Sequence, residues 1–152
     1  RSYYSNIHGL NSRLDNIQAT ILSSKLDFLK KWINKRRKIA QIYSNAFFDK
    51  NKINKDHVFH LYVVKSNLRN ELRKFLQSKN IYTGIHYENP THSMKPYLKY
   101  NRNVRNHLTN SKKFSKEVIS LPLHPFLKIY QIRKVIREIK NFNNKYNHEF
   151  KP

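Results

Sequence analysis

The chain has 152 residues, no cysteine, and 31 Lys and Arg against 9 Asp and Glu, which gives a formal net charge of +22. The lack of cysteine excludes disulfides and thiolate metal sites and fits a cytoplasmic protein. We expect no membrane-spanning segment, because no apolar run approaches about 18 residues, and no signal peptide, because the first residues form no apolar stretch.

The positive charge has two interpretations. A polyanion such as nucleic acid would be attracted to it, which makes a basic nucleic-acid-binding module an alternative function. Lys and Arg are, however, spread from Lys25 to Lys151, and the densest cluster, Lys30 to Lys38, lies within a helical pattern. Charges on one side of a helix commonly face solvent, so nucleic acid is not the partner we favour.

The segment from Asp15 to Phe47 is predicted to form one long helix. Apolar residues recur along it at helical spacings, and neither glycine nor proline interrupts it. Ser12 and Asp15 have the spacing of a capping box at its start. At about 1.5 Å per residue the helix would be roughly 45–50 Å long, more than a small domain needs. Helices of this length usually connect two bodies, so we expect a further domain beyond this chain.

The rest of the chain predicts an α/β domain of the α+β kind, in which helices pack against a small, mostly antiparallel sheet of about three strands. Strands are expected at His57–Lys65 and Ile81–Tyr87, with a short one at Leu121 and Leu123. Helices are expected from Asn67, as N-cap, to Asn80 in the left-handed conformation, and at about Thr109–Ser120 and Ile129–Tyr146. The segment from Glu88 to Arg105 is predicted to be a long loop, which is often functional.

Eight histidines invite a metal hypothesis. His57 and His60 would point to opposite faces of a strand and cannot share one ion. His86 and His92 would converge only if the loop between them folds back. Because cysteine is absent and carboxylates are few, we expect no metal site.

The two glycines, Gly9 and Gly84, lie in unusual stretches and are interpreted as points where the backbone passes close to something bound. Gly9 would allow a turn with positive φ, which would place Asn11 just ahead of a helix N-terminus. Such a position suits a phosphate, because backbone N–H groups and the positive end of the helix dipole are there. The alternative is that Asn11 or Ser12 only caps the helix.

Three blocks of the sequence carry a recognisable pattern. They are YYSNIHGLNSRLDNIQATILSSKLDFLKKWINKRRKIAQIYSNAF, HVFHLYVVKSNLRNELRKFLQSKNIYTGIHYENPTH and SKEVISLPLHPFL. In this order they resemble the DegT/DnrJ/StrS family of sugar-nucleotide aminotransferases, from about Tyr3 to Lys140. The most specific parts are G-x-N-x-R-L-D-x-x-Q-A and H-Y-x-x-P-x-H.

The resemblance implies the C-terminal part of a fold-type I enzyme that uses pyridoxal 5'-phosphate and works as a homodimer. The Schiff-base lysine of the family would lie upstream, so no catalytic residue is expected in this chain, and the chain alone should be inactive. Asn11 would contact the cofactor phosphate of the neighbouring subunit. Arg13, His86, Tyr87 and His92 would border the sugar-nucleotide pocket.

By the same resemblance, residues 1–14 would be a loop from the large domain, 15–47 a linking helix, 48–147 the C-terminal small domain and 148–152 a frayed tail. The parent enzyme would transfer an amino group, from glutamate, to a keto-sugar nucleotide for polysaccharide, such as O-antigen, or antibiotic sugars. A dehydratase or a regulatory member of the family is the alternative. Glu88 stands where the family usually has proline, which would either alter substrate preference or point to solvent.

Overall fold

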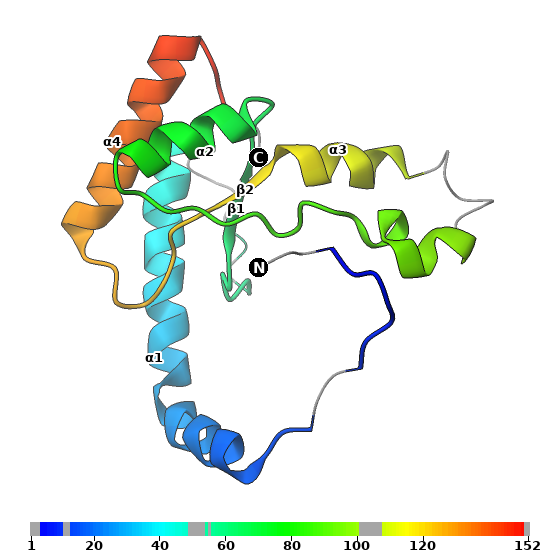
Figure 1. Cartoon of the computed structure of the whole chain (residues 1–152). Helices are drawn as coiled ribbons and strands as arrows, with labels where there is room; N and C mark the ends of the chain where they lie inside the picture. Colours follow the sequence, from blue (N-terminus) through cyan, green and yellow to red (C-terminus); the bar gives the residue numbers. More distant parts are fainter. Residues whose placement is uncertain (1–3, 11–12, 49–53, 55, 101–107, 151–152) are drawn as a thin grey trace.

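The computed structural model describes residues 4–10, 13–48, 54, 56–100 and 108–150 (Figure 1). One long helix comes first, and two short strands, three further α-helices and two short 3-10 helices follow it in the described part of the chain. In chain order they are α1 (Asn16–Phe47), β1 (Tyr62–Lys65), α2 (Arg69–Ser78), η1 (Thr91–Ser93), η2 (Lys95–Tyr100), α3 (Thr109–Glu117), β2 (Val118–Leu121) and α4 (Ile129–Tyr146).

Helix α1 confirms the predicted long helix, and Asp15 is its N-cap. The Asp15 carboxylate accepts a hydrogen bond of 3.0 Å from the backbone N–H of Gln18. Ser12, the predicted partner in a capping box, lies outside the described residues. Because Asp15 caps the helix, Asn11 is not needed for that purpose. Figure 1 shows that the C-terminal half of α1 lies beside the other elements while its N-terminal half extends away from them.

The sheet is antiparallel, as predicted, but smaller. Strands β1 and β2 pair from Tyr62 opposite Leu121 to Lys65 opposite Val118. In place of a third strand at Ile81–Tyr87, Gly84 and Ser120 form a single antiparallel bridge with hydrogen bonds of 3.0 and 2.8 Å. The sheet expected from the sequence is therefore present with its third strand reduced to one contact.

Several predicted boundaries were wrong for local reasons. The strand expected from His57 starts only at Tyr62, because Phe59 has a φ of 49° and its N–H bonds to the His57 ring in a turn. The short strand expected at Leu121 and Leu123 instead ends at Leu121, because the next residue is Pro122, which has no N–H to donate to a ladder. Helix α3 ends at Glu117, because the chain from Val118 on is strand β2.

Helix α2 is shorter than predicted at its start. Asn67 is not its N-cap: Leu68 occupies that position, and its N–H donates to the Ser66 hydroxyl at 3.1 Å. Asn80 follows the helix with a φ of 56°, which confirms the predicted left-handed residue.

The hydrophobic core lies between α1, α2, α4 and the sheet. Tyr43 of α1 is fully buried in it and donates a hydrogen bond of 2.9 Å to the carbonyl oxygen of Pro122. The chain after α4 also contributes, because Phe150 is buried and its ring lies 5.4 Å from that of Phe47. His148 and Phe150 are thus packed, contrary to the predicted frayed tail, whereas Glu149 between them is exposed. None of the described helices is long and apolar enough to cross a membrane.

Candidate functional site

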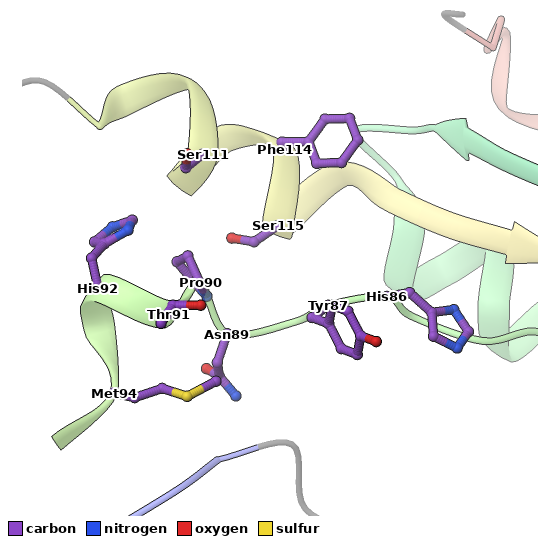
Figure 2. Close-up of a pocket in the computed structure, with 10 residues that line it drawn as sticks. All are labelled: His86, Tyr87, Asn89, Pro90, Thr91, His92, Met94, Ser111, Phe114 and Ser115. Carbon is purple, nitrogen blue, oxygen red and sulfur yellow. The ribbon is translucent and has the colours of Figure 1, made fainter. Parts of the chain in front are cut away.

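A cavity of about 620 Å³ lies between α3 and the segment that follows the Gly84 bridge. Its size is within the range of small-molecule sites. Figure 2 shows the ten lining residues, with His86 and Tyr87 at one end, His92 at the other, and the Ser115 hydroxyl pointing from α3 toward the facing segment. The complete lining is His86, Tyr87, Asn89, Pro90, Thr91, His92, Met94, Ser111, Phe114 and Ser115.

The cavity brings together three of the residues predicted to border a substrate. His92, in η1, lines the same cavity as His86 and Tyr87 but stands at its opposite end (Figure 2). Arg13 is exposed and belongs to the segment before α1, outside this lining. Asn11, the predicted contact for a cofactor phosphate, lies outside the described residues.

The His86 ring is held in place by two features of the sheet edge. Its Nδ1 atom lies 2.9 Å from the Ser120 hydroxyl, on strand β2. A Cβ atom added at Gly84 would lie 2.5 Å from Cε1 of the same ring. Gly84 therefore leaves room for the His86 imidazole, which is a reason for glycine within the chain itself. A close approach to a bound ligand at Gly84 stays a prediction from the sequence.

Gly9 differs from Gly84. A Cβ atom there would meet no described atom within 4 Å, and its φ is not positive, contrary to the predicted turn. Its neighbour His8 contacts the ring edge of Tyr97 in η2, with ring centroids 4.9 Å apart. This contact places the segment that leads to Asn11 next to the segment that forms the cavity.

The cavity lining combines apolar surface with several uncharged polar groups and carries no carboxylate among the described residues. Hydroxyl and amide groups come from Asn89, Thr91, Ser111 and Ser115, and the Phe114 ring and Met94 supply apolar surface. Amides and hydroxyls both donate and accept hydrogen bonds, which suits the hydroxyl groups of a sugar. A lining without carboxylates also avoids repelling an anionic group.

A buried arginine behind the cavity was missed by the sequence analysis. Arg69, at the first turn of α2, is 6% exposed, and its Nη1 donates to the carbonyl oxygen of Ser115 at 3.0 Å. Its Nη2 atom lies 3.9 Å from Oε1 of Glu88. Glu88 was expected either to alter substrate preference or to point to solvent. Its side chain is half exposed, but its carboxylate is directed to Arg69 and not simply to solvent. Nothing in the local sequence distinguishes this arginine from an exposed one.

Comparison with known proteins finds similarity over most of the chain. The sequence profile of the DegT/DnrJ/EryC1/StrS aminotransferase family matches residues 1–140. The chain is 35% identical over 149 residues to a "pleiotropic regulatory protein" of Geobacillus stearothermophilus, covering 92% of this chain. It is 33% identical over 148 residues to a dTDP-3-amino-3,6-dideoxy-alpha-D-galactopyranose transaminase of Aneurinibacillus thermoaerophilus, covering 93% of this chain.

The fold is also similar to a solved structure. The crystal structure of DesV from S. venezuelae matches with a TM-score of 0.76 and 31% identity over 93% of this chain. In each of these three proteins the matched region is about 40% of the protein's own length.

Proposed function

We propose, since the chain belongs to the DegT/DnrJ/EryC1/StrS aminotransferase family, that it forms the C-terminal part of an enzyme that transfers an amino group to a keto-sugar nucleotide. The observation that carries this proposal is the family match over residues 1–140. The cavity supports it, because His86, Tyr87 and His92 line one space of suitable size. A relative named as a dTDP-sugar transaminase supports the substrate class.

The residues of this chain would act by binding and orienting the substrate. We assign the sugar to the cavity, where the amides and hydroxyls of Asn89, Thr91, Ser111 and Ser115 offer hydrogen bonds. The net charge of +22 favours the approach of an anionic diphosphate. Arg13 would contact the substrate from the segment ahead of α1.

The cofactor of such an enzyme would be pyridoxal 5'-phosphate, which when bound supplies the electron sink for amino transfer. We propose that Asn11 binds its phosphate in the neighbouring subunit of a homodimer. The N-cap supports this assignment, because Asp15 occupies it and leaves the Asn11 amide without a capping role. No described neighbour of Gly9 would clash with a side chain at that position. The glycine is therefore in keeping with a segment that contacts a group outside this chain.

Asn11→Asp tests the cofactor assignment. The carboxylate would repel the phosphate, so we expect the parent enzyme to lose cofactor on dialysis while the melting temperature of the apo-protein stays unchanged. Asp15→Asn is the control. It exchanges a carboxylate and an amide near the start of α1, as Asn11→Asp does, and it keeps a good N-cap. Equal cofactor retention in wild-type protein and Asn11→Asp would refute the assignment.

Glutamate as amino donor, a role in polysaccharide or antibiotic sugar synthesis, and a cytoplasmic location belong to the same proposal. Glutamate and the pathway follow from the family resemblance. The absence of cysteine is in keeping with this location. The exposed apolar residues on the N-terminal half of α1 support an assembly in which another domain or subunit covers them.

The direct test is the reaction itself. The parent enzyme, loaded with pyridoxal phosphate, is incubated with a dTDP-linked keto sugar and glutamate, and the products are identified by mass spectrometry. We expect an amino sugar nucleotide and 2-oxoglutarate in equal amounts. Loss of a hydroxyl group from the sugar without transfer of nitrogen would instead identify a dehydratase.

A regulatory protein is the second candidate, because one relative is named as a pleiotropic regulatory protein. A regulatory member would bind the nucleotide sugar without converting it. Binding without turnover, over a panel of keto-sugar nucleotides, would therefore favour this candidate. A basic nucleic-acid-binding module stays a prediction from charge alone, and binding that disappears near physiological salt would remove it.

A further inference from the structure

Arg69 lies behind the candidate cavity, at a point from which it reaches both of the cavity's walls. One wall is α3, which contributes Ser115, and the other is the segment from His86 to Met94. The Arg69 guanidinium donates to the carbonyl oxygen of Ser115 at 3.0 Å and lies 3.9 Å from the Glu88 carboxylate. The two walls are far apart in sequence, and a single side chain therefore connects them.

A buried guanidinium must find partners, because leaving its charge and its N–H groups unsatisfied is costly. In addition to Ser115 and Glu88, the Nε of Arg69 donates to Oδ1 of Asn70 at 2.9 Å. The fork of the guanidinium spreads these contacts in fixed directions, which a lysine would not reproduce. The position of Arg69 thus constrains the spacing between its partners.

Glu88 lies between two residues that line the cavity, Tyr87 and Asn89, but is not itself part of the lining. Its side chain is 54% exposed and is directed toward Arg69. Without that attraction, a carboxylate at this position would be next to the space in which an anionic ligand binds. The negative charge of the carboxylate would repel that of the ligand and weaken binding.

We propose that Arg69 is a positioning residue of the cavity, which holds α3 and the Tyr87–Asn89 segment at a fixed spacing and keeps the Glu88 carboxylate away from a phosphate-bearing substrate. The second part rests on the proposed function. The first part concerns this chain alone. Arg69 touches neither substrate nor cofactor and acts through Ser115 and Glu88.

The first test is hydrogen exchange on the 152-residue chain, which needs no ligand. Glu88→Gln removes the ion pair and keeps the side-chain shape. We expect the amides of residues 87–94 to exchange up to about fivefold faster, the largest effect typical of a half-exposed ion pair, while the amides of α4 are unchanged. The control is Glu71→Gln, the same substitution at an exposed position in the first turn of α2.

Two outcomes of this experiment overturn the first part of the proposal. One is an unchanged exchange rate at residues 87–94 in Glu88→Gln. The other is an equal increase in Glu71→Gln, which would show an effect of charge in general. Arg69→Lys adds a second variant that keeps the buried charge, and we expect it to speed exchange in the same segment because the lysine cannot bond to both walls.

The second test uses the parent enzyme and its keto-sugar nucleotide. Arg69→Gln should raise the KM for that substrate about tenfold, with kcat changed less than about twofold, because Arg69 acts on binding and not on the reacting atoms. Adding Glu88→Gln should recover a large part of the lost KM, because the repelling carboxylate is then absent. A purely structural arginine would show no such recovery.

The two tests separate this inference from the proposed function. If the wild-type enzyme converts no keto-sugar nucleotide, the proposed function fails, and hydrogen exchange alone decides whether Arg69 holds the walls. If the wild-type enzyme is active and Arg69→Gln leaves KM unchanged, or Glu88→Gln does not lower the KM of the double variant, the role of Arg69 in substrate binding is refuted.

Discussion

The two halves of α1 have the same apolar pattern and opposite surroundings. In the C-terminal half Ile39, Ala40 and Tyr43 are at most 5% exposed. In the N-terminal half the apolar side chains at equivalent spacings are about half exposed or more, among them Ile17, Ile21, Leu22, Phe28 and Leu29. One continuous apolar face of a helix is therefore covered at one end only.

The difference shows what an amphipathic pattern does and does not establish. The spacing of apolar residues determines which face of a helix requires a partner. It does not determine whether that partner belongs to the same chain. For the C-terminal half the partners are α4 and the sheet, whereas for the N-terminal half no described element of this chain provides a cover. Substitutions in the two halves should therefore have different consequences.

The largest contrast is expected between Tyr43→Ala and Leu22→Ala in the 152-residue chain. Tyr43 is fully buried, so its truncation removes an aromatic side chain from the core and should cost about 3–5 kcal/mol of unfolding free energy. Leu22 is 53% exposed, and its truncation should change stability by less than about 0.5 kcal/mol. Urea unfolding followed by circular dichroism measures both. Equal losses would show that the N-terminal half is also packed.

The ionisation of tyrosine at high pH should act on the C-terminal half of α1 alone. Burial raises the pKa of Tyr43 well above its ordinary value, and the nearby Tyr62 hydroxyl raises it further. Because the neutral phenol is favoured by the fold, its stabilisation is complete below about pH 10 and is lost as the pH rises above the ordinary pKa of tyrosine. The N-terminal half, from Asn16 to Lys31, contains no tyrosine.

Tyr43→Phe isolates this effect. Both proteins lose lysine charges in the same range, so the difference between them reports on the Tyr43 phenol. We expect the free energy of unfolding of wild-type protein to fall more steeply between about pH 10 and 12 than that of Tyr43→Phe. A residual fall is expected from Tyr62, whose pKa is also raised by burial. Parallel curves for the two proteins would contradict the assignment.

The N-cap tests the exposed half. Asp15→Ala removes the acceptor for the Gln18 N–H and should cost about 1 kcal/mol of local helix stability. Because the first turns of α1 are not packed on the core, we expect faster hydrogen exchange there and an unchanged midpoint of urea unfolding. Asp27→Ala, an exposed position in the interior of the same helix, is the control. A lowered unfolding midpoint in Asp15→Ala would mean that the two halves unfold as one unit.

The sequence predicted the elements that depend on local periodicity. Helices α1 and α4 have nearly the predicted bounds, because a sustained helical spacing without glycine or proline signals them directly. The strands were less predictable, because each is four residues long and exists through pairing with a distant segment. The single bridge at Gly84 depends on pairing with a distant segment, and neither this bridge nor the turn at Phe59 can be predicted from the local sequence pattern.

The candidate site was predictable to a similar extent. The motif from His86 to His92 was visible in the sequence, and the structure places its two histidines and Tyr87 on one cavity. The opposite wall was not visible, because Ser111, Phe114 and Ser115 face the cavity only through the packing of α3. Arg69 could not be found either, since its bond to Ser115 spans 46 residues. Local motifs therefore identify one wall of such a site, and tertiary contacts supply the other.

The smallest expected effect lies at the border between the two halves of α1, where Trp32, the single tryptophan, stands. Its ring stacks on Phe28 at 5.8 Å and meets the ring edge of Phe126 at 6.1 Å, and Phe126 is 65% exposed. Removing an exposed ring from such a pair should cost about 0.5 kcal/mol.

Phe126→Ala should therefore shift the fluorescence emission of Trp32 to longer wavelength, because water replaces the Phe126 ring, while the unfolding midpoint hardly changes. Phe114→Ala, a half-exposed aromatic residue that lines the cavity instead, is the control and should leave the emission unchanged. In an assembly that covers the N-terminal half, the emission of the wild-type protein should move to shorter wavelength than in the chain alone. If Trp32 emits at the same wavelength in the assembly and in the chain alone, the apolar face is not covered at Trp32, and the residues covered in the assembly lie nearer to Asn16.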